Sequence, residues 1–432
     1  MDYKEAMDYI HKVGNFGSNY GLERTYRLLE ILGNPQEKLK LIHIAGTNGK
    51  GSTTAMLCSL LRGKGFKVGM YTSPFLEEFE ERIQINGVNI PKERLAKLID
   101  KLKEAVDKVI NEGYSHPTEF EVITCLMFLY FYEEKVDYGV VEVGLGGRLD
   151  STNVIAPILS VITSISFDHT NLLGNTLSEI AEEKAGIIKE GIPVVIYHQE
   201  EEALDVIEKK AKYLGSHLYA IDSSDGHFVS TVEEDKLYQV VNIKDKLDVK
   251  LPLLGEHQIS NLLVALKAFE IISKIDNFSI DEECIKKSIH DVKWIGRLEI
   301  MNSNPMIVID GAHNIQGITS LKTNIEKYFK YNNLYLLLGI LADKQVEDMV
   351  KTIVPMAKKV YALTPNSDRA ELAVELKKVV EKYNKDCTAF ENYEDAMKSI
   401  LKEAKTDDLI LISGSLYMIG DMRKLIRTKF NN

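Results

Sequence analysis

The feature of the sequence that most constrains the fold is a glycine-rich segment between two apolar runs. The residues from Lys40 to Ala45 are typical of a buried strand, the segment from Gly46 to Thr53 reads GTNGKGST, and the residues from Ser52 to Gly63 are typical of a helix. Glycines allow backbone N–H groups to converge on an anion, and the amino end of a helix adds positive potential there. The order of strand, loop and helix therefore predicts a phosphate-binding loop in an α/β sheet.

The loop also carries side chains that suit phosphate chemistry. Lys50 supplies a point charge for phosphate oxygens, and the hydroxyl of Ser52 or Thr53 suits Mg²⁺ or a phosphate. The loop departs from the general pattern G-x-x-x-x-G-K-[ST], because Ile44 replaces the first glycine and Gly51 follows the lysine. A plain glycine-rich turn is the alternative, and the complete order of strand, lysine and helix favours the phosphate loop.

Strand-like and helix-like segments alternate through most of the chain, which indicates α/β layers. Between Ser223 and Pro252 the runs become short, polar and alternating, as in a small antiparallel sheet. Beyond the segments above, strands are predicted at 140–143, 159–163, 193–197, 306–309, 334–338, 359–363 and 409–412, and helices at 177–189 and 260–274.

The pattern breaks near residues 294–297, and we predict two α/β domains that touch. Residues 1–296 are expected to form a P-loop ATPase-like domain with a mostly parallel sheet and the antiparallel patch at 223–253. Residues 297–432 are expected to form a smaller, Rossmann-like α/β domain. This length fits two or three domains of ordinary size.

Charge and composition exclude several classes of protein. The net charge is −11, which is the wrong sign for a nucleic-acid-binding protein. The longest apolar stretch, Cys125 to Tyr132, is far shorter than a membrane span, and the first residues lack a secretory pattern. The four cysteines lie far apart, which favours buried thiols. We expect a monomer in the cytoplasm, with no nucleic-acid or membrane partner.

The segment Gly46–Ser52 resembles the nucleotide loop of folylpolyglutamate synthases and dihydrofolate synthases, which belong to the Mur ligase superfamily. Cell-wall Mur enzymes usually carry Thr or Ser directly after the lysine, whereas Gly51 followed by Ser52 is similar to the folate branch. Phe75 and Ile295 stand where family members often have His and Pro. Other segments that match the family in order are 21–24, 32–36, 72–74, 81–83, 118–121, 142–150, 168–169, 183–186, 257–261, 296–299 and 310–314.

The resemblance implies an ATP-dependent ligase. ATP would phosphorylate the carboxylate of a folate or of dihydropteroate, and the amine of L-glutamate would then displace the phosphate. It implies that Lys50, Lys184, Asp310 and His313 are catalytic. It also implies that ATP is held by Gly46, Thr47, Asn48, Gly49, Lys50, Gly51, Ser52, Thr53, Asn261, Arg297, Asp310 and His313. From the residues alone, Asn261 suits a helix cap and Asp310 a turn, although a turn leaves His313 unexplained.

The resemblance also implies a pair of Mg²⁺ ions. Glu142 ends a predicted buried strand beside glycines, where open α/β sheets bind ligands and where a carboxylate suits Mg²⁺. By resemblance, Ser73 and Glu142 hold the first ion and His169 holds the second. Lys184 would be carbamylated by CO₂. The alternative for Lys184 is a solvated cluster with Glu182 and Glu183.

Substrate contacts are expected from several elements. The segment from Ser73 to Ile90 is expected to form a mobile loop over the pterin. Asp150 suits either a pterin or a helix cap, and Ser413-Gly414-Ser415 suits a carboxylate. The predicted substrate-binding residues are Phe75, Arg82, Phe120, Asp150 and Ser415.

Two other functions compete with this interpretation. A Mur-type ligase of a cell-wall precursor is disfavoured by Gly51-Ser52 and by the segment from Gly147 to Asp150. A P-loop ATPase that moves a partner would not need Asn261, Asp310 and His313 in a second α/β unit.

Overall fold

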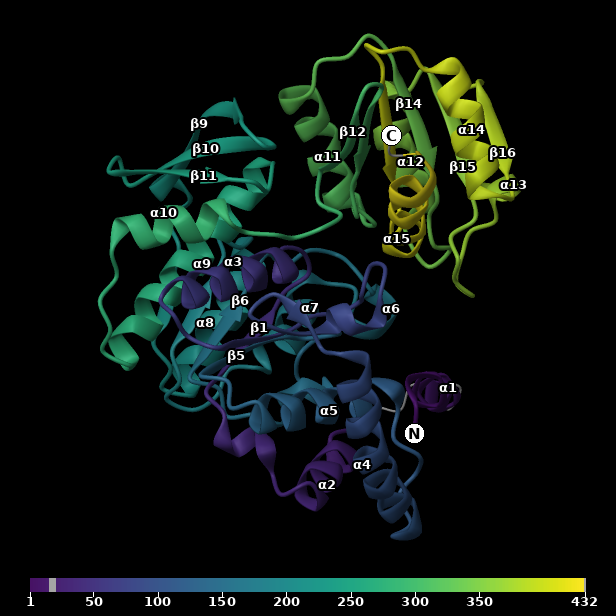
Figure 1. Ribbon diagram of the computed structural model, residues 1–432. Coiled ribbons are helices and arrows are strands. Elements are labelled where there is room, and N and C mark those ends of the chain that lie inside the picture. The colour runs from purple at the N-terminus through teal and green to yellow at the C-terminus, as the bar shows by residue number, and fades with distance from the viewer. Residues whose placement is uncertain (15–20, 431–432) are drawn as a thin grey trace.

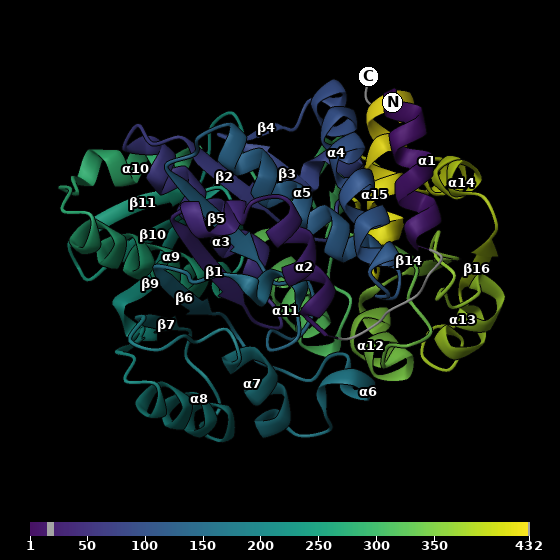
Figure 2. The same ribbon diagram turned by 90° about the horizontal axis from the view of Figure 1, so that it is seen from below.

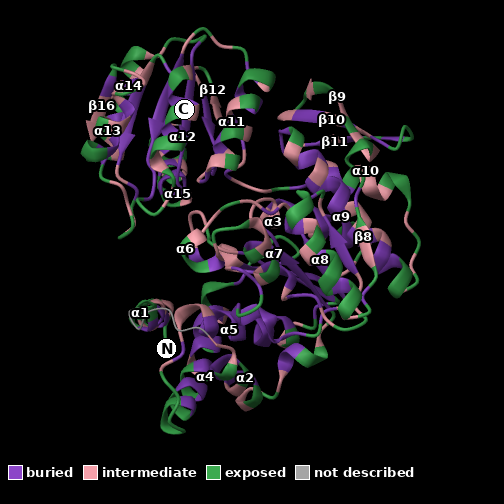
Figure 3. Cartoon of the chain, turned by 180° about the vertical axis from the view of Figure 1, so that it is seen from behind, coloured by how far each residue is buried: buried purple, intermediate pink, exposed green. Residues whose placement is uncertain are grey.

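The computed structural model describes residues 1–14 and 21–430. Figure 1 shows two α/β units, which we call the N-terminal and the C-terminal unit, and a small sheet beside the first. The predicted fold class is therefore confirmed. Each large sheet has helices on both faces, and its central strands are buried while the outer helix faces are exposed (Figure 3).

The N-terminal unit is built on an eight-stranded sheet in the order β4-β3-β2-β5-β1-β6-β7-β8. Along this order, the six strands β2, β5, β1, β6, β7 and β8 run parallel to one another. Strand β3 runs antiparallel to β2, and β4 runs antiparallel to β3. The strands are β1 (Leu41–Ala45), β2 (Val68–Tyr71), β3 (Ile83–Ile85), β4 (Val88–Asn89), β5 (Tyr138–Glu142), β6 (Leu159–Ile162), β7 (Val194–Ile196) and β8 (Leu218–Ala220).

Both faces of β1 are buried, which explains why His43 is its one polar residue. Leu41 packs in one core with Tyr71 and the helices on that face (Figure 2), and Ile42 packs in a second core on the other face. The helices of the first face include α1 (Tyr3–Gly14), α2 (Glu23–Ile31), α4 (Lys92–Asn111) and α5 (Glu119–Glu133); α7 (Leu177–Ala185) and α8 (Glu201–Tyr213) form a further core with the sheet. The second face is covered by α3 (Lys50–Gly63) and α9 (Glu256–Ile275).

The predicted antiparallel patch is a separate sheet of three strands in the order β11-β10-β9. It packs against α9 and α10 (Glu282–His290) and shares the second core. Its strands are β9 (Gly226–Glu233), β10 (Leu237–Ile243) and β11 (Leu247–Leu251).

The C-terminal unit has a six-stranded sheet in the order β12-β13-β17-β14-β15-β16, in which only β12 is antiparallel to its neighbour. Its strands are β12 (Glu299–Ser303), β13 (Met306–Ile309), β14 (Leu334–Leu338), β15 (Lys359–Leu363), β16 (Cys387–Phe390) and β17 (Leu409–Ser413). Its helices are α11 (Ile315–Tyr328), α12 (Val346–Ile353), α13 (Ala373–Val380), α14 (Tyr393–Glu403) and α15 (Leu416–Leu425).

The structure corrects several element boundaries. Helix α3 begins at Lys50 rather than at Ser52, and α9 begins at Glu256 rather than at residue 260. The segment 73–90 is not one mobile loop, because residues 83–85 and 88–89 are strands of the large sheet. Residues 79–82 before them form a short 3₁₀ turn.

Candidate active site

A cavity of about 300 Å³ lies between the two units. The carboxyl ends of β1, β5 and β13 reach its wall, through Gly46, Glu142 and Asp310. Open parallel sheets bind ligands at this edge, and here two such edges face one cavity. The fold therefore brings the predicted loop and the predicted C-terminal residues together.

Two close approaches of the backbone shape the phosphate loop. A Cβ atom on Gly46 would lie 1.8 Å from Oγ1 of Thr163, and one on Gly49 would lie 2.4 Å from Oδ1 of Asn261. Both glycines also have positive φ angles, so only glycine fits without strain. The ammonium of Lys50 donates to the carbonyl oxygens of Gly46 and Thr47, both at 3.1 Å. The residues from Gly46 to Ser52 line the cavity, whereas Thr53 is buried behind it.

Glu142 is the last residue of β5, and 4% of its surface is exposed. Burial raises the pKa of its carboxyl to about 7, although Lys50 and Arg297 favour the charged form. The backbone N–H of Ser73 donates to the carboxyl, and both residues line the cavity. The structure thus places the predicted metal ligands Ser73 and Glu142 next to each other.

Asp168 links the two units. Burial alone would raise the pKa of Asp168, but the ammonium of Lys344 at 2.6 Å, and then His169 and His313, lower it well below its usual range. The nearest ring nitrogens of the two histidines lie 3.9 Å and 3.8 Å from the carboxylate. Asn314 also donates to Asp168 at 3.1 Å. Residues from both units therefore converge beside His169, the predicted ligand of the second ion.

Lys184 lies in the wall of the cavity on α7, and 3% of its surface is exposed. Its ammonium donates to the carbonyl of Gly46 at 2.9 Å. Burial, and then the charge of Lys50, lower its pKa to about 7. The alternative of a solvated charge cluster is therefore wrong, because the helix turns Lys184 inward while Glu182 stays exposed.

The remaining predicted nucleotide contacts also line the cavity. Asn261 lies inside α9 and bonds to Gln258 at 3.0 Å, so its alternative role as a helix cap is wrong. The carboxylate of Asp310 accepts the N–H groups of Leu298 and Ala312, both at 2.9 Å, which forms the predicted turn. Burial lowers the pKa of His313 to about 4, and its Nδ1 lies 2.7 Å from the carbonyl of Gly311.

A larger cavity of about 830 Å³ adjoins the first. Its wall includes four of the five predicted substrate-binding residues, namely Arg82, Phe120, Asp150 and Ser415. Ser415 is fully buried at the start of α15, and its hydroxyl has no hydrogen-bond partner within the described residues. Phe75 is absent from both walls; its ring lies against Phe79 and the guanidinium of Arg82.

The hydrogen bonds of Asp150 favour its role as a cap. One oxygen accepts the N–H and the hydroxyl of Thr152, at 3.0 Å and 2.5 Å, and the other accepts the N–H of Leu145 at 2.8 Å. Asp150 thereby caps a 3₁₀ turn at Ser151–Val154 and fixes the backbone that follows Glu142.

Sequence reasoning missed Lys344 and Arg369, which enter the larger cavity from loops of the C-terminal unit. Lys344 also approaches Nε2 of His169 at 3.5 Å. Each lies in a polar loop with no recognisable motif, so only the three-dimensional fold reveals them. Similarly, Gln316 accepts a hydrogen bond from Asn48 of the phosphate loop at 2.5 Å, across the two units.

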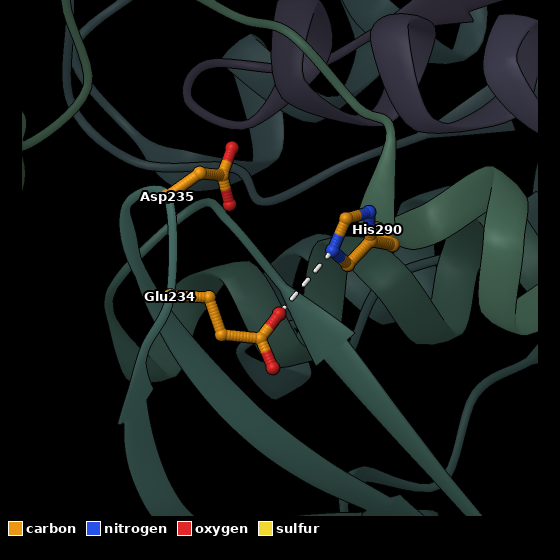
Figure 4. A group of neighbouring side chains, drawn as sticks. All are labelled: Glu234, Asp235 and His290. Carbon is orange, nitrogen blue, oxygen red and sulfur yellow. Dashed lines mark ion pairs between the residues drawn. The ribbon is translucent and has the colours of Figure 1, made fainter.

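Glu234, Asp235 and His290 form a second group of possible metal ligands, beside the three-stranded sheet (Figure 4). They have protein partners instead. Lys250 pairs with Glu234, Tyr238 donates to Asp235 at 2.8 Å, and the ring of His290 stacks on Tyr238. We assign no function to this exposed group.

Two family models match the chain. The Mur ligase middle domain matches residues 44–269, and the glutamate ligase domain of Mur ligases matches residues 296–416. The dihydrofolate synthase/folylpolyglutamate synthase of Bacillus subtilis is 37% identical over 98% of this chain and 99% of its own length. The chain belongs to the folylpolyglutamate synthase and dihydrofolate synthase family of Mur ligases.

Solved structures of the family agree with this fold. The Mycobacterium tuberculosis folylpolyglutamate synthase complexed with ADP and AMPPCP superposes with a TM-score of 0.89, at 29% identity, over 98% of this chain and 99% of that one. A folylpolyglutamate synthase complex with AMPPCP and folate gives a TM-score of 0.85 at 32% identity, over 99% and 100%. Within the described residues, no helix has the length and apolar character needed to cross a membrane.

Proposed function

We propose that this protein uses ATP to join L-glutamate, through an amide bond, to the carboxylate of a folate-type acceptor. The observation that carries the proposal is the wall shared by the two cavities. Ser73, the segment 144–146, His169 and His313 line both the smaller and the larger cavity. ATP in the smaller cavity therefore presents its terminal phosphate to an acceptor in the larger one. The names of the relatives support this choice of substrates.

The reaction follows from this arrangement. An oxygen of the acceptor carboxylate attacks the terminal phosphorus, the bond to ADP breaks, and an acyl phosphate forms. The amine of glutamate then attacks the carbonyl carbon, and phosphate leaves. Phosphoryl transfer needs positioning and neutralised charge, which the loop N–H groups, Lys50 and Arg297 supply. Asn261 and Asp310 hold the nucleotide from either side of the cavity.

We assign His313 to the junction of the two cavities, where it would position the reacting groups. A carbonyl oxygen only accepts hydrogen bonds, so the contact with Gly311 fixes the proton on Nδ1. Because burial lowers its pKa to about 4, His313 is neutral at pH 7, and its Nε2 lies 3.8 Å from the carboxylate of Asp168. This ring lies in the wall that both cavities share.

The donor set in this wall suits Mg²⁺, and we assign Ser73 and Glu142 to one ion and His169 to a second. A buried carboxylate whose pKa is raised to about 7 gains its charged form when a cation is beside it. When bound, Mg²⁺ would neutralise charge on the phosphates.

We also assign a carbamate to Lys184. A neutral amine adds to CO₂ and releases one proton, and a pKa near 7 leaves much of Lys184 neutral at physiological pH. The carbamate would turn a cation that repels Lys50 into an anion that attracts it. Enzyme freed of CO₂ should lose most of its activity and regain it with bicarbonate. The same activity with and without CO₂ would exclude the carbamate.

Dihydropteroate as a second acceptor completes the proposal, and the two activities named for the Bacillus subtilis relative support it. A pterin contact from Asp150 stays a prediction, because hydrogen bonds within the protein occupy its carboxylate. Kinetics of Asp150→Ala separate the two roles. Selective loss of dihydropteroate ligation indicates a pterin contact, whereas equal losses on both acceptors indicate a cap.

We place the enzyme in the cytoplasm as a monomer, and the free thiols of its four cysteines support the reducing compartment. We place the domain boundary between residues 296 and 297, just before β12 begins at Glu299.

A substrate panel tests the function. ATP and glutamate are incubated with dihydropteroate, tetrahydrofolate or a UDP-muramoyl peptide, and products are identified by mass. We expect glutamate to be added to the two folate-type acceptors. Addition to the UDP-linked acceptor would instead show a cell-wall ligase. Fast ATP hydrolysis without any acceptor would indicate a P-loop ATPase.

A further inference from the structure

Gly51 occupies the position where a general phosphate loop carries Ser or Thr. The structure explains this departure. A Cβ atom on Gly51 would lie 2.3 Å from Cζ2 of Trp294 and 2.9 Å from its Cε2. The six-membered ring of the indole therefore lies directly against the first turn of α3. No side chain fits at position 51 while the indole stays in place.

Trp294 lies in the segment that joins the two units, between the end of α10 and the start of β12 (Figure 1). The indole packs on the core beside α3 and α9. Two residues later the chain reaches Gly296, whose φ is +71°, and then Arg297 in the wall of the smaller cavity, where we place the nucleotide. The guanidinium of Arg297 lies close against Gly311 of the C-terminal unit.

The contact thus joins two parts of the nucleotide site. The first turn of α3 carries N–H groups that no helix carbonyl uses, and its residues Lys50, Gly51 and Ser52 line the smaller cavity. Arg297 reaches the same cavity from the connecting segment. Between them, the packed pair Gly51 and Trp294 fixes where the segment leaves the N-terminal unit.

We propose that Trp294 is a positioning residue for the nucleotide site, and that Gly51 leaves the space in which its indole packs. Trp294 sets the distance between the phosphate loop and Arg297, so that both contact the same nucleotide. The inference rests on the proposed use of ATP, but it does not depend on the identity of the acceptor.

A size-exchange experiment tests this pair. Gly51→Ala adds the clashing atom, Trp294→Leu removes most of the ring, and the double variant does both. The added methyl group would displace the indole or the loop, so Gly51→Ala should raise the KM for ATP by about tenfold or more. The double variant should bind ATP better than Gly51→Ala alone, because the smaller side chain leaves room for the new methyl group.

Gly63→Ala is the matched control. Gly63 ends the same helix, and its added Cβ would lie 2.0 Å from Oγ of Ser288 on α10, away from the nucleotide cavity. This variant should lower the melting temperature without changing the KM for ATP. Trp294→Phe keeps an aromatic ring and should lie between the wild type and Trp294→Leu in its KM for ATP.

Trp294 is the single tryptophan of the chain, so its fluorescence reports on the contact without any ligation assay. Titration with ADP should change the fluorescence emission of the wild-type protein. In Gly51→Ala, the same change should require higher ADP concentrations. If Gly51→Ala binds ADP with wild-type affinity, or if the effects of Gly51→Ala and Trp294→Leu simply add, the proposal is wrong. A failure of the ligation panel alone would leave this binding result intact.

Discussion

Glu142 is the residue on which the proposed phosphoryl transfer depends most. It combines deep burial with a raised pKa and lies beside Ser73 at the end of a strand. Its position was predictable, because an acid that follows a buried apolar run and precedes glycines marks the carboxyl end of a parallel strand. The contacts of Lys344 were not predictable, since they form only when the two units meet.

Glu142→Gln should therefore lower kcat by at least about a hundredfold, because the amide cannot carry the charge that holds Mg²⁺. Steady-state rates over a range of Mg²⁺ concentrations measure this loss, with circular dichroism to monitor the fold. Asp408→Asn is the control, since this buried carboxylate accepts the backbone N–H groups of Asn333 and Lys405 in the C-terminal unit. It should lower the melting temperature and keep the Mg²⁺ dependence. A Glu142→Gln variant with full activity would remove Glu142 from the ion site.

His43 provides a prediction about stability and pH. It is fully buried in β1, and its Nε2 lies 2.8 Å from the hydroxyl of Thr152. Because that hydroxyl donates its proton to Asp150, Nε2 of His43 must be the donor. Burial, and then Lys189, lower the pKa of His43 to about 3.

The folded-state pKa of His43 lies below its unfolded value of about 6.5, so the unfolded chain binds the extra proton below that pH. The contribution of His43 to the free energy of unfolding is therefore complete above pH 6.5. It falls by about 1.4 kcal/mol per pH unit as the pH decreases from 6.5 toward 3. The free energy of unfolding is measured in urea at pH 6.5 and at pH 5. Its decrease between these two pH values should be about 2 kcal/mol smaller in His43→Gln than in the wild type. The exposed His227→Gln is the control. An unchanged difference in His43→Gln would contradict the assignment.

At the level of elements, the central strands were predictable and the edge strands were not. The predicted bounds of β13, β14 and β15 match the structure, because strands buried on both faces are uninterrupted apolar runs. Strands β3, β4 and β12 are short or partly exposed, and their mixed sequences resemble loops. A family resemblance supplied the site residues, but only the structure showed that the segment after Ser73 is held rather than mobile.

The carboxylate of Glu81 holds that segment by accepting the N–H groups of Leu76, Glu77 and Glu78. Arg423 on α15 then pairs with Glu77, and with Glu299 at 2.7 Å. The segment joins Ser73, at the smaller cavity, to Arg82, at the larger one. The C-terminal unit therefore positions one wall of the acceptor cavity.

Arg423→Met should raise the KM for the folate acceptor by about tenfold and leave the KM for ATP nearly unchanged. It should also lower the melting temperature, because Glu299 loses its charged partner and Glu77 keeps only the more exposed Arg427. Arg427→Met removes a more exposed partner of Glu77 and should have a much smaller effect. Equal increases in both KM values would show that Arg423 supports the fold in general rather than the acceptor wall.

At the scale of the whole molecule, two sheets present their carboxyl edges to each other, and the candidate site exists only between them. The sequence indicated both α/β units, because each has its own alternating pattern. It did not indicate how they meet, since the contacts of Asp168 with Lys344 and of Asn48 with Gln316 join residues far apart in the chain. The proposed reaction depends on the junction of the two cavities, because a phosphate and a carboxylate would react there.

Oxygen-isotope transfer tests that junction most directly. The reacting carboxylate of the folate acceptor is labelled with ¹⁸O, and the products of ligation with ATP and glutamate are analysed by mass spectrometry. An acyl phosphate formed at the junction transfers one labelled oxygen to inorganic phosphate in each turnover, and the other stays in the new amide. Phosphate without the label, with the amide still formed, would exclude an acyl phosphate at the junction.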